Sequence, residues 1–346
     1  MSGGWDEARG RIEVGDHALA CAVTRPRRGG LHPAVLLLPP LGPRARTGPL
    51  AAAPPHDGIA ALLRDLADAG FVTLRADPCG AGESGGPAYA EASLEADLEG
   101  HRAALEAIAS LPFVEPARVF VLGLSLGGVL APLVVAGAEV RGIAVYGTPS
   151  RRWSECLADT ARRQLTLAGL ADDARDREAA RAARLYDLVL RAGTSPATIA
   201  RDHPDLAACR AAADLGPHHL HGRALHYFRA LDCVDPEAAW GRVTAPVLAL
   251  RGEHDFILAD DDPARIAAFV TASGGRARAL TLPGLDHDLL RQPDLAASFA
   301  QRGRGAPDPS AARALIAWMR AESEGTPPPR FTPGPPAGDT GGTTEV

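Results

Sequence analysis

Short apolar runs separated by amphipathic segments are the dominant pattern along the chain. Residues 33–38 form a short continuous apolar run, as expected of a strand buried on both faces, and residues 71–75, 119–124 and 140–146 are further predicted strands, mostly apolar. Segments with helical spacing lie between most of these runs. Strands that alternate with helices predict right-handed β-α-β crossovers, and therefore an α/β fold with a mostly parallel, doubly wound sheet.

The alternation changes between residues 149 and 241. This segment is rich in Ala, Arg and Leu with helical spacing, and it contains no convincing strand. The α/β pattern resumes with apolar runs at 245–250 and 277–282. We therefore expect a helical cap over residues 149–241, inserted late in the sheet between two parts of one core, 11–148 and 242–322.

Both ends of the chain are polar. Residues 1–10 read as a frayed, disordered end without the apolar segment of a secretion signal, and alternation over 11–25 predicts a hairpin that turns at Gly15-Asp16. Residues 323–346 are rich in Pro, Gly and Thr and have almost nothing to bury, so we expect a disordered tail.

Composition narrows the functional classes. The chain has 346 residues, of which 46% are apolar, and a net charge of −6 without a basic stripe, which argues against a nucleic-acid partner. The five cysteines lack the spacing of zinc or redox sites, so we expect no metal and no cofactor. The sequence has neither an apolar signal core nor a run of transmembrane length, which favours a cytoplasmic protein. The oligomeric state is left open.

One motif joins a predicted strand to a predicted helix. Gly123-Leu124-Ser125-Leu126-Gly127 follows the apolar run 119–122 and precedes a helix-like segment. A serine at so sharp a turn adopts strained backbone angles, and glycine on either side leaves room for the chain to pass. Its hydroxyl would stand at a helix N-terminus, where free N–H groups can hold an anion. We predict that Ser125 is a nucleophile; the alternative is a glycine-bounded turn with an incidental serine.

Two later loops supply partners for this serine. Asp255 lies just after the run 245–250, and His287 lies just after the run 277–282. A serine hydroxyl needs a base to take its proton, and the base needs an acid to orient it. Open parallel sheets place their sites at the carboxyl ends of strands, so we predict His287 as the base and Asp255 as its partner. Glu253 and His254 are the neighbours that could be mistaken for Asp255.

Other polar residues near these loops are assigned structural roles. Asp286 and Asp288 are too close in sequence to His287 to orient its ring, and Asp77 lies in a Gly-rich loop whose backbone it would brace. Three histidines in the predicted cap have no cysteine or carboxylate at ligand spacing, so a polar cap face is expected of them rather than a metal site. They are His218, His219 and His221.

The loop after the run 33–38 is long and rich in proline, and loops of that length inside compact domains are often functional. In this architecture, the strand before it leads to one donor of an oxyanion hole. Pro39 and Pro40 have no N–H. We therefore predict the backbone N–H groups of Leu41 and Leu126 as the two donors.

These motifs resemble the α/β-hydrolase superfamily of serine hydrolases, and in particular its capped esterase- and aminopeptidase-like branch. The resemblance is carried by residues 77–84, 123–128, 145–149, 252–255 and 283–287. One position departs from the pattern, because Pro39-Pro40 stands where family members usually carry His-Gly. That change must alter the shape and polarity of the acyl pocket.

The resemblance implies hydrolysis of a carboxylic ester or thioester of a small-molecule acyl substrate. His287 would take the proton of Ser125 as it attacks the carbonyl carbon, Asp255 would hold the imidazole, and the N–H groups of Leu41 and Leu126 would bind the oxyanion. Amide or peptide-end hydrolysis and acyl transfer are alternatives on the same residues. A non-catalytic binding protein of the same fold is the alternative from a different class.

Overall fold

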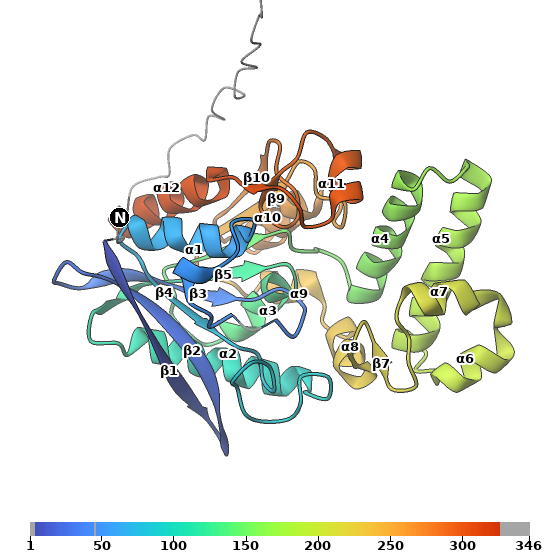
Figure 1. Ribbon diagram of the computed structural model, residues 1–346, viewed down its shortest axis with the longest axis horizontal. Coiled ribbons are helices and arrows are strands. Elements are labelled where there is room, and N and C mark those ends of the chain that lie inside the picture. The colour runs from blue at the N-terminus through green and yellow to red at the C-terminus, as the bar shows by residue number, and fades with distance from the viewer. Residues whose placement is uncertain (1–3, 45, 326–346) are drawn as a thin grey trace, which may run out of the picture.

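A computed structural model describes residues 4–44 and 46–325 and contains a twisted eight-stranded sheet with helices on both faces (Figure 1). Only the first two strands run antiparallel to their neighbours, and all other pairs are parallel. The expected α/β class with a mostly parallel sheet is confirmed. In spatial order the strands are β1 (Trp5–Val14), β2 (His17–Pro26), β4 (Val72–Ala76), β3 (His32–Leu38), β5 (Val114–Leu124), β6 (Gly142–Tyr146), β9 (Val247–Gly252) and β10 (Ala277–Leu282).

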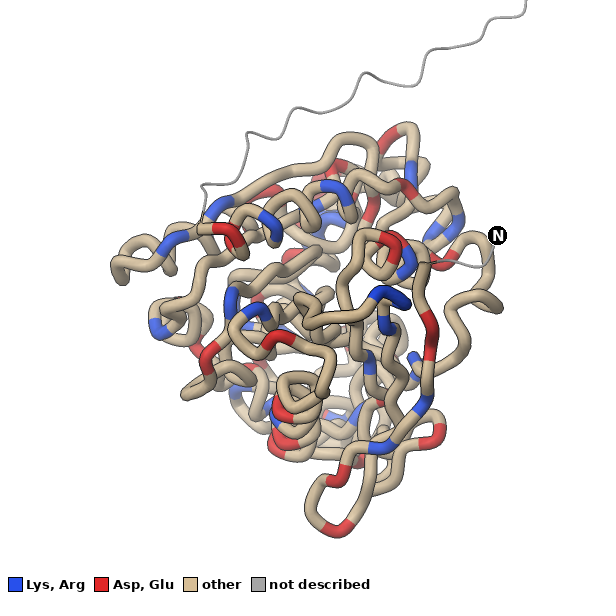
Figure 2. Tube along the Cα trace, turned by 90° about the vertical axis from the view of Figure 1, so that its left-hand side faces the viewer, with Lys and Arg blue, Asp and Glu red and all other residues tan. Residues whose placement is uncertain are grey.

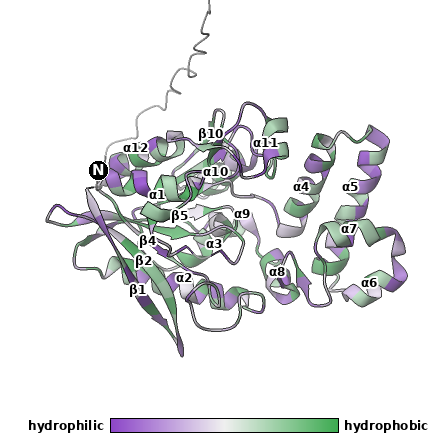
Figure 3. Cartoon of the chain, viewed as in Figure 1, coloured by the Kyte–Doolittle hydropathy of each residue, from purple (hydrophilic) through white to green (hydrophobic). Residues whose placement is uncertain are grey.

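The N-terminal hairpin is present, but it starts earlier than expected. Strand β1 begins at Trp5 and pairs with β2 along its whole length, so the prediction of a disordered segment over 1–10 is wrong for residues 5–10. Residues 1–3 lie outside the described residues. Hydrophobic patterning does not predict β1 because its sequence is polar (Figure 3). A strand at a sheet edge is held by backbone pairing and needs little burial. The indole N–H of Trp5 also donates to Asp68 at 2.8 Å.

Alternate residues of the central strands pack into two separate cores. In β3, Leu36 and Leu38 contact the core under one helical layer, whereas Val35 and Leu37 contact the other. A strand buried on both faces has no polar side, which explains its continuous apolar sequence. One layer contains α2 (Leu94–Ala109), α3 (Leu126–Val134) and α10 (Asp262–Ala272); the other contains α1 (Gly58–Asp68) and α12 (Ser310–Glu324).

Side-chain caps mark where two of these helices begin. Asp57 accepts a hydrogen bond from Ala60 N at the start of α1, and Ser93 accepts one from Ala96 N at the start of α2. Gly70 follows α1 with φ at 93°, which lets the chain turn into β4. These local signals set the crossovers that place the sheet's carboxyl ends at one edge.

Helices fill the interval between β6 and β9, and we call residues 153–240 the helical insertion. Its outer helices project away from the sheet (Figure 1). A short hairpin, whose strands β7 and β8 have two residues each, was not expected in this segment. The insertion contains α4 (Trp153–Leu167), α5 (Asp172–Tyr186), η2 (Asp187–Arg191), α6 (Pro196–Asp202), η3 (Pro204–Leu206), α7 (Ala207–Ala212), β7 (His219–Leu220), β8 (Arg223–Ala224), α8 (Leu225–Asp232) and α9 (Pro236–Trp240).

The C-terminal helix α12 extends through Glu324, so the expected disordered tail over 323–346 is wrong for its first two residues. Residues 326–346 lie outside the described residues. Within the described ranges, no helix combines the length and apolarity needed to span a bilayer. Basic and acidic residues are interspersed along the trace (Figure 2). The remaining short elements are η1 (Leu50–Ala52), β11 (Leu290–Arg291), α11 (Leu295–Gln301) and β12 (Ala306–Pro307).

Candidate active site

Ser125 occupies a strained turn between β5 and α3. Its φ of 52° and ψ of −116° lie in a region that residues other than glycine rarely adopt. Its N–H donates to the carbonyl of Tyr146 at 2.9 Å, and its own carbonyl accepts from Gly128 N at 3.0 Å. These two hydrogen bonds hold the turn against the end of β6, so the strain is fixed by its surroundings.

The glycines around Ser125 are required by close approach. A Cβ at Gly123 would lie 2.5 Å from the Cα of Gly128, and one at Gly127 would overlap the carbonyl oxygen of Leu38. A Cβ at Gly128 would overlap the side chain of Thr148. The motif therefore allows helix α3 to start directly beside the carboxyl ends of β3 and β6.

Asp255 and His287 meet at the carboxyl edge of the sheet. Asp255 Oδ2 and His287 Nδ1 are 2.8 Å apart, and the aspartate is fully buried. Its other oxygen, Oδ1, accepts hydrogen bonds from the backbone N–H groups of Ile257 at 2.8 Å and Leu258 at 3.1 Å. The carboxylate therefore has one oxygen held by its own loop and the other directed at the imidazole.

This pairing perturbs both titrating groups. Burial alone would raise the pKa of Asp255, but the facing His287 and the backbone donors lower it below its ordinary value. For His287, burial favours the neutral ring, yet the Asp255 carboxylate outweighs it and raises the pKa to about 9. The imidazolium is the form that the buried carboxylate stabilises, which is what a base requires after it has accepted a proton.

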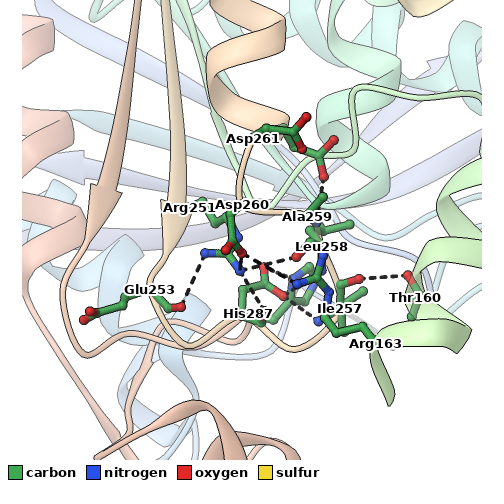
Figure 4. Close-up of polar contacts among 12 residues, drawn as sticks. Thr160, Arg163, Arg251, Glu253, Ile257, Leu258, Ala259, Asp260, Asp261 and His287 are labelled. Carbon is green, nitrogen blue, oxygen red and sulfur yellow. Dashed lines mark hydrogen bonds and ion pairs between the residues drawn. The ribbon is translucent and has the colours of Figure 1, made fainter. Parts of the chain in front are cut away.

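Arg251 of β9 forms several polar contacts with the loop that carries Asp255 (Figure 4). The buried guanidinium donates to the carbonyl of Asp255 at 2.9 Å and to that of Leu258 at 3.3 Å, and it pairs with Asp260 at 2.7 Å. From the helical insertion, Thr160 of α4 donates to the carbonyl of Ile257 at 2.8 Å. Contacts from both the sheet and the insertion thus fix the Asp255 loop.

The imidazole of His287 lies over the end of β6, next to the serine turn. A Cβ at Gly147 would come 3.0 Å from His287 Cε1, and Gly147 directly follows the residue whose carbonyl accepts from Ser125 N. Ser125 and His287 line the same cavity, of about 1080 Å³. Within the described residues, the imidazole forms a hydrogen bond with Asp255 and none with the Ser125 hydroxyl.

Of the two predicted oxyanion donors, Leu41 borders this cavity, and Leu126 directly follows Ser125, which borders it too. Leu126 is the first residue of α3, where an N–H has no partner within the helix. Leu41 follows the two prolines after β3 and lines the cavity. In the described part of the chain, neither N–H donates to a protein oxygen. The next residue, Gly42, donates its N–H to the hydroxyl of Tyr89 at 2.8 Å.

A buried cluster behind Tyr89 joins the core to the helical insertion. Arg223 lies 4.4 Å from the centre of the Tyr89 ring and 3.6 Å from that of Tyr227, and it forms an ion pair with Asp97 at 2.8 Å. The Tyr227 hydroxyl donates to Asp97 at 3.2 Å. Sequence reasoning missed this cluster, because its members come from separate segments and share no motif.

The other polar residues have mixed outcomes. The loop-bracing role expected of Asp77 is confirmed, since it accepts from Glu83 N of its own loop at 3.4 Å and from Thr47 N at 3.0 Å. Asp286, expected to be either solvated or loop-bracing, is buried and accepts from Leu290 N at 2.9 Å. His221, expected on a polar cap face, instead lines the cavity. His219 is bonded to Glu91 at 2.6 Å. No group of three His, Cys, Asp or Glu side chains within the described ranges is arranged to hold a metal ion.

Comparison with known proteins places the chain in a family. The family model for serine aminopeptidase, S33, matches residues 57–294, which is more than half of the sequence. The chain belongs to this family of α/β-hydrolases. The matched range includes the serine turn, the helical insertion and the loops that carry Asp255 and His287. Among curated proteins, none matches it in sequence.

Solved structures share the fold of this S33-family hydrolase. Est1E from Butyrivibrio proteoclasticus is 14% identical with a TM-score of 0.54, over 91% of this chain and 99% of that one. Proline iminopeptidase from Mycobacterium smegmatis is 21% identical with a TM-score of 0.56, over 92% and 99%. An esterase from the archaeon Pyrobaculum calidifontis is 16% identical with a TM-score of 0.55, over 92% and 86%. At these identities, the likeness is one of fold.

Proposed function

We propose that this S33-family protein is a serine hydrolase that cleaves carboxylic ester or thioester bonds through an acyl-enzyme on Ser125. The observation that carries the proposal is the 2.8 Å Asp255–His287 contact, on the same cavity as a serine held at a strained strand-to-helix turn. A structural serine has no need of positive φ, and a buried His–Asp pair beside it is the arrangement that activates a hydroxyl.

The reaction would proceed in two halves. The Ser125 hydroxyl attacks the carbonyl carbon while His287 Nε2 takes its proton, and Asp255 stabilises the imidazolium that forms. The oxyanion is bound by the N–H groups of Leu41 and Leu126, and the imidazolium then protonates the departing alcohol or thiol. Water, deprotonated by the now neutral His287, attacks the acyl-enzyme and releases the acid.

Peptide-end hydrolysis is the second candidate, because the matching family is described as serine aminopeptidase. An aminopeptidase binds the α-ammonium group of its substrate, which requires a nearby negative charge. The carboxylates of Asp57 and Asp288 line the cavity and would supply that charge. We favour ester and thioester cleavage because Pro149, Trp153, Leu157 and other apolar side chains line much of the same cavity.

Turnover and covalent labelling test the proposal. We expect the protein to hydrolyse p-nitrophenyl butyrate or a butyryl thioester, and a fluorescent fluorophosphonate to label it at one serine. Ser125→Ala should abolish turnover and labelling, whereas Ser110→Ala, which removes an exposed serine hydroxyl at the end of α2, should retain both. Equal labelling of Ser125→Ala would refute the assignment. Release of proline or another amino acid from aminoacyl anilides, without ester turnover, would favour the second candidate.

A further inference from the structure

The loop that carries His287 must cross one strand to reach the serine turn. In the sheet, β6 lies between β5, which leads to Ser125, and β9, whereas the His287 loop follows β10 on the far side of β9. At Gly252, the last residue of β9, an added Cβ would overlap the carbonyl oxygen of Leu285 and lie 2.7 Å from that of Asp286. The loop therefore passes directly over the end of β9, and its contacts determine how far it extends toward β6.

Hydrogen bonds with the Asp255 loop fix one side of this crossing. The His254 N–H donates to the carbonyl of Leu285 at 2.8 Å, and the Gly284 N–H donates to the carboxylate of Glu253 at 2.9 Å. Glu253 and His254 directly precede Asp255, so these bonds keep the two loops in register with each other. Neither bond reaches the serine turn.

Tyr146, the last residue of β6, contacts both the serine turn and the His287 loop. Its carbonyl accepts the Ser125 N–H at 2.9 Å, and its hydroxyl donates to the carbonyl of Asp286, the residue before His287, at 2.5 Å. Within the described residues, no other hydrogen bond joins residues 283–292 to β5, β6 or α3. One side chain therefore connects the loop of the proposed base to the strand that holds the proposed nucleophile.

The residue after Tyr146 limits movement in the opposite direction. A Cβ added at Gly147 would come 3.0 Å from both Nδ1 and Cε1 of His287, so the imidazole already lies against the backbone at the end of β6. This backbone prevents the ring from moving closer to β6, and the Tyr146 hydroxyl restrains the loop from moving away. Together the two contacts bracket the position of the imidazole.

The Tyr146 hydroxyl is suited to a fixed contact. Tyr146 is 2% exposed and Asp286 is 1% exposed, so the hydrogen bond is shielded from water. Burial and the nearby Asp255 carboxylate raise the pKa of Tyr146 well above its ordinary value of 10, so the phenol keeps its proton and remains a donor. Because a buried carbonyl without a donor costs free energy, the contact restrains the loop.

We propose that Tyr146 is a positioning residue, whose hydroxyl holds the His287 imidazole at the distance from Ser125 that proton transfer requires. This inference rests on the proposed hydrolase function. The hydroxyl acts through the Asp286 carbonyl rather than on the reacting atoms. Proton transfer needs the two groups within hydrogen-bond reach, and a displacement of about 1 Å lowers the rate by as much as about 100-fold.

Tyr146→Phe tests this role, because it keeps the ring in the core and removes the hydroxyl. With p-nitrophenyl butyrate we expect kcat to fall by roughly 10- to 100-fold with KM nearly unchanged, since the loss of one hydrogen bond sets the lower figure and a displacement of about 1 Å the upper one. The rate of fluorophosphonate labelling at Ser125 should fall in parallel. The pH midpoint of kcat/KM should stay at the wild-type value, because the Asp255–His287 contact and the bonds between their loops are retained.

Tyr227→Phe is the matched control. It also removes a buried tyrosine hydroxyl, but one that donates to Asp97 at 3.2 Å rather than to a residue of the His287 loop. That variant should keep the wild-type kcat, labelling rate and pH midpoint. Thermal denaturation of both variants shows whether the loss of either hydroxyl acts on stability alone.

The kinetic outcomes separate this inference from the proposed function. A wild-type kcat in Tyr146→Phe, with or without a lower Tm, would refute the positioning role while a Ser125-dependent hydrolase stands. An equal fall of kcat in Tyr227→Phe would refute it as well. A lowered pH midpoint in Tyr146→Phe would also overturn it, because the hydroxyl would then act on the Asp255–His287 pair instead.

If the wild type hydrolyses no ester, NMR spectroscopy of the His287 ring provides the test. The ring Cε1–H resonance that is absent from the spectrum of His287→Gln should shift in Tyr146→Phe and stay in place in Tyr227→Phe. An unmoved resonance in Tyr146→Phe would show that the hydroxyl does not set the position of the imidazole, whatever reaction the protein catalyses.

Discussion

Tyr89 offers a direct test of the proposed oxyanion site, because its hydroxyl accepts the Gly42 N–H at 2.8 Å. Gly42 is the residue after Leu41 and has φ at 135°, so this hydrogen bond restrains the peptide that follows the proposed donor. Tyr89→Phe keeps the ring beside Arg223 but leaves the Gly42 N–H without that partner. The loop should then sample other orientations, and the Leu41 N–H should lose alignment with the oxyanion.

The magnitude follows from the strength of the lost contact. A neutral hydrogen bond contributes about 0.5–1.5 kcal/mol net, and each ~1.4 kcal/mol is about tenfold in rate. If the loss is felt in the transition state, kcat should fall by roughly 2- to 13-fold with KM nearly unchanged. Complete loss of an oxyanion donor lowers kcat by about 100- to 1,000-fold, which sets the upper limit for the effect of Tyr89→Phe.

Tyr227→Phe is the matched control. It removes a hydroxyl from the other side of Arg223, one that donates to Asp97 at 3.2 Å and does not contact the Gly42 loop. The assay is kcat and KM on p-nitrophenyl butyrate, with inhibition by an aryl boronic acid as a transition-state probe and Tm for both variants. Equal kcat in the two variants, at similar Tm, would refute the idea that Tyr89 positions the oxyanion loop.

Two further predictions concern buried charge. The Asp255 carboxylate overcomes the effect of burial and raises the pKa of His287 above its ordinary value of 6.5, so kcat/KM should increase with pH as the ring deprotonates, with a midpoint above that value. Asp255→Asn should lower both the rate and the midpoint in pH–rate profiles, and an unchanged midpoint would contradict the coupling. Asp97→Asn should leave the Arg223 guanidinium buried without its counter-charge, at a cost of about 3–5 kcal/mol in the free energy of unfolding measured with urea. A loss well under about 1 kcal/mol would mean that the ion pair is not an anchor of the helical insertion.

The parts of the fold that the sequence predicts are those with a local signal. Strand β9 is buried on both faces and appears as an apolar run, whereas β10 is a half-exposed edge strand. The loops after these two strands hold Asp255 and His287, which the structure brings together. Strand β1 was missed over residues 5–10 because its pairing with β2 leaves one side exposed, so its sequence is polar. Edge strands are stabilised by backbone hydrogen bonds, which leave little mark on side-chain pattern.

Tertiary relations produce the rest of the site. The contact of Tyr89 with Gly42 and that of Arg223 with Asp97 join segments far apart in sequence, and neither pair has a spacing that predicts it. His221 was expected on a polar face because no cysteine or carboxylate stands at metal-ligand spacing from it in the sequence. Its place on the cavity depends on how β7 and β8 fold back toward the core, which no periodicity encodes.

The strand order has a consequence for how such enzymes diversify. β6 and β9 are hydrogen-bonded neighbours, so the chain leaves the sheet for the helical insertion and returns to it at adjacent positions. Segments of different length or sequence can therefore be grafted between these strands without displacing Ser125 or its partners. If the graft retains an arginine that pairs with Asp97 as Arg223 does, a chimera would combine a new recognition surface with the proposed reaction centre, so substrate selectivity could change while the proposed chemistry is kept.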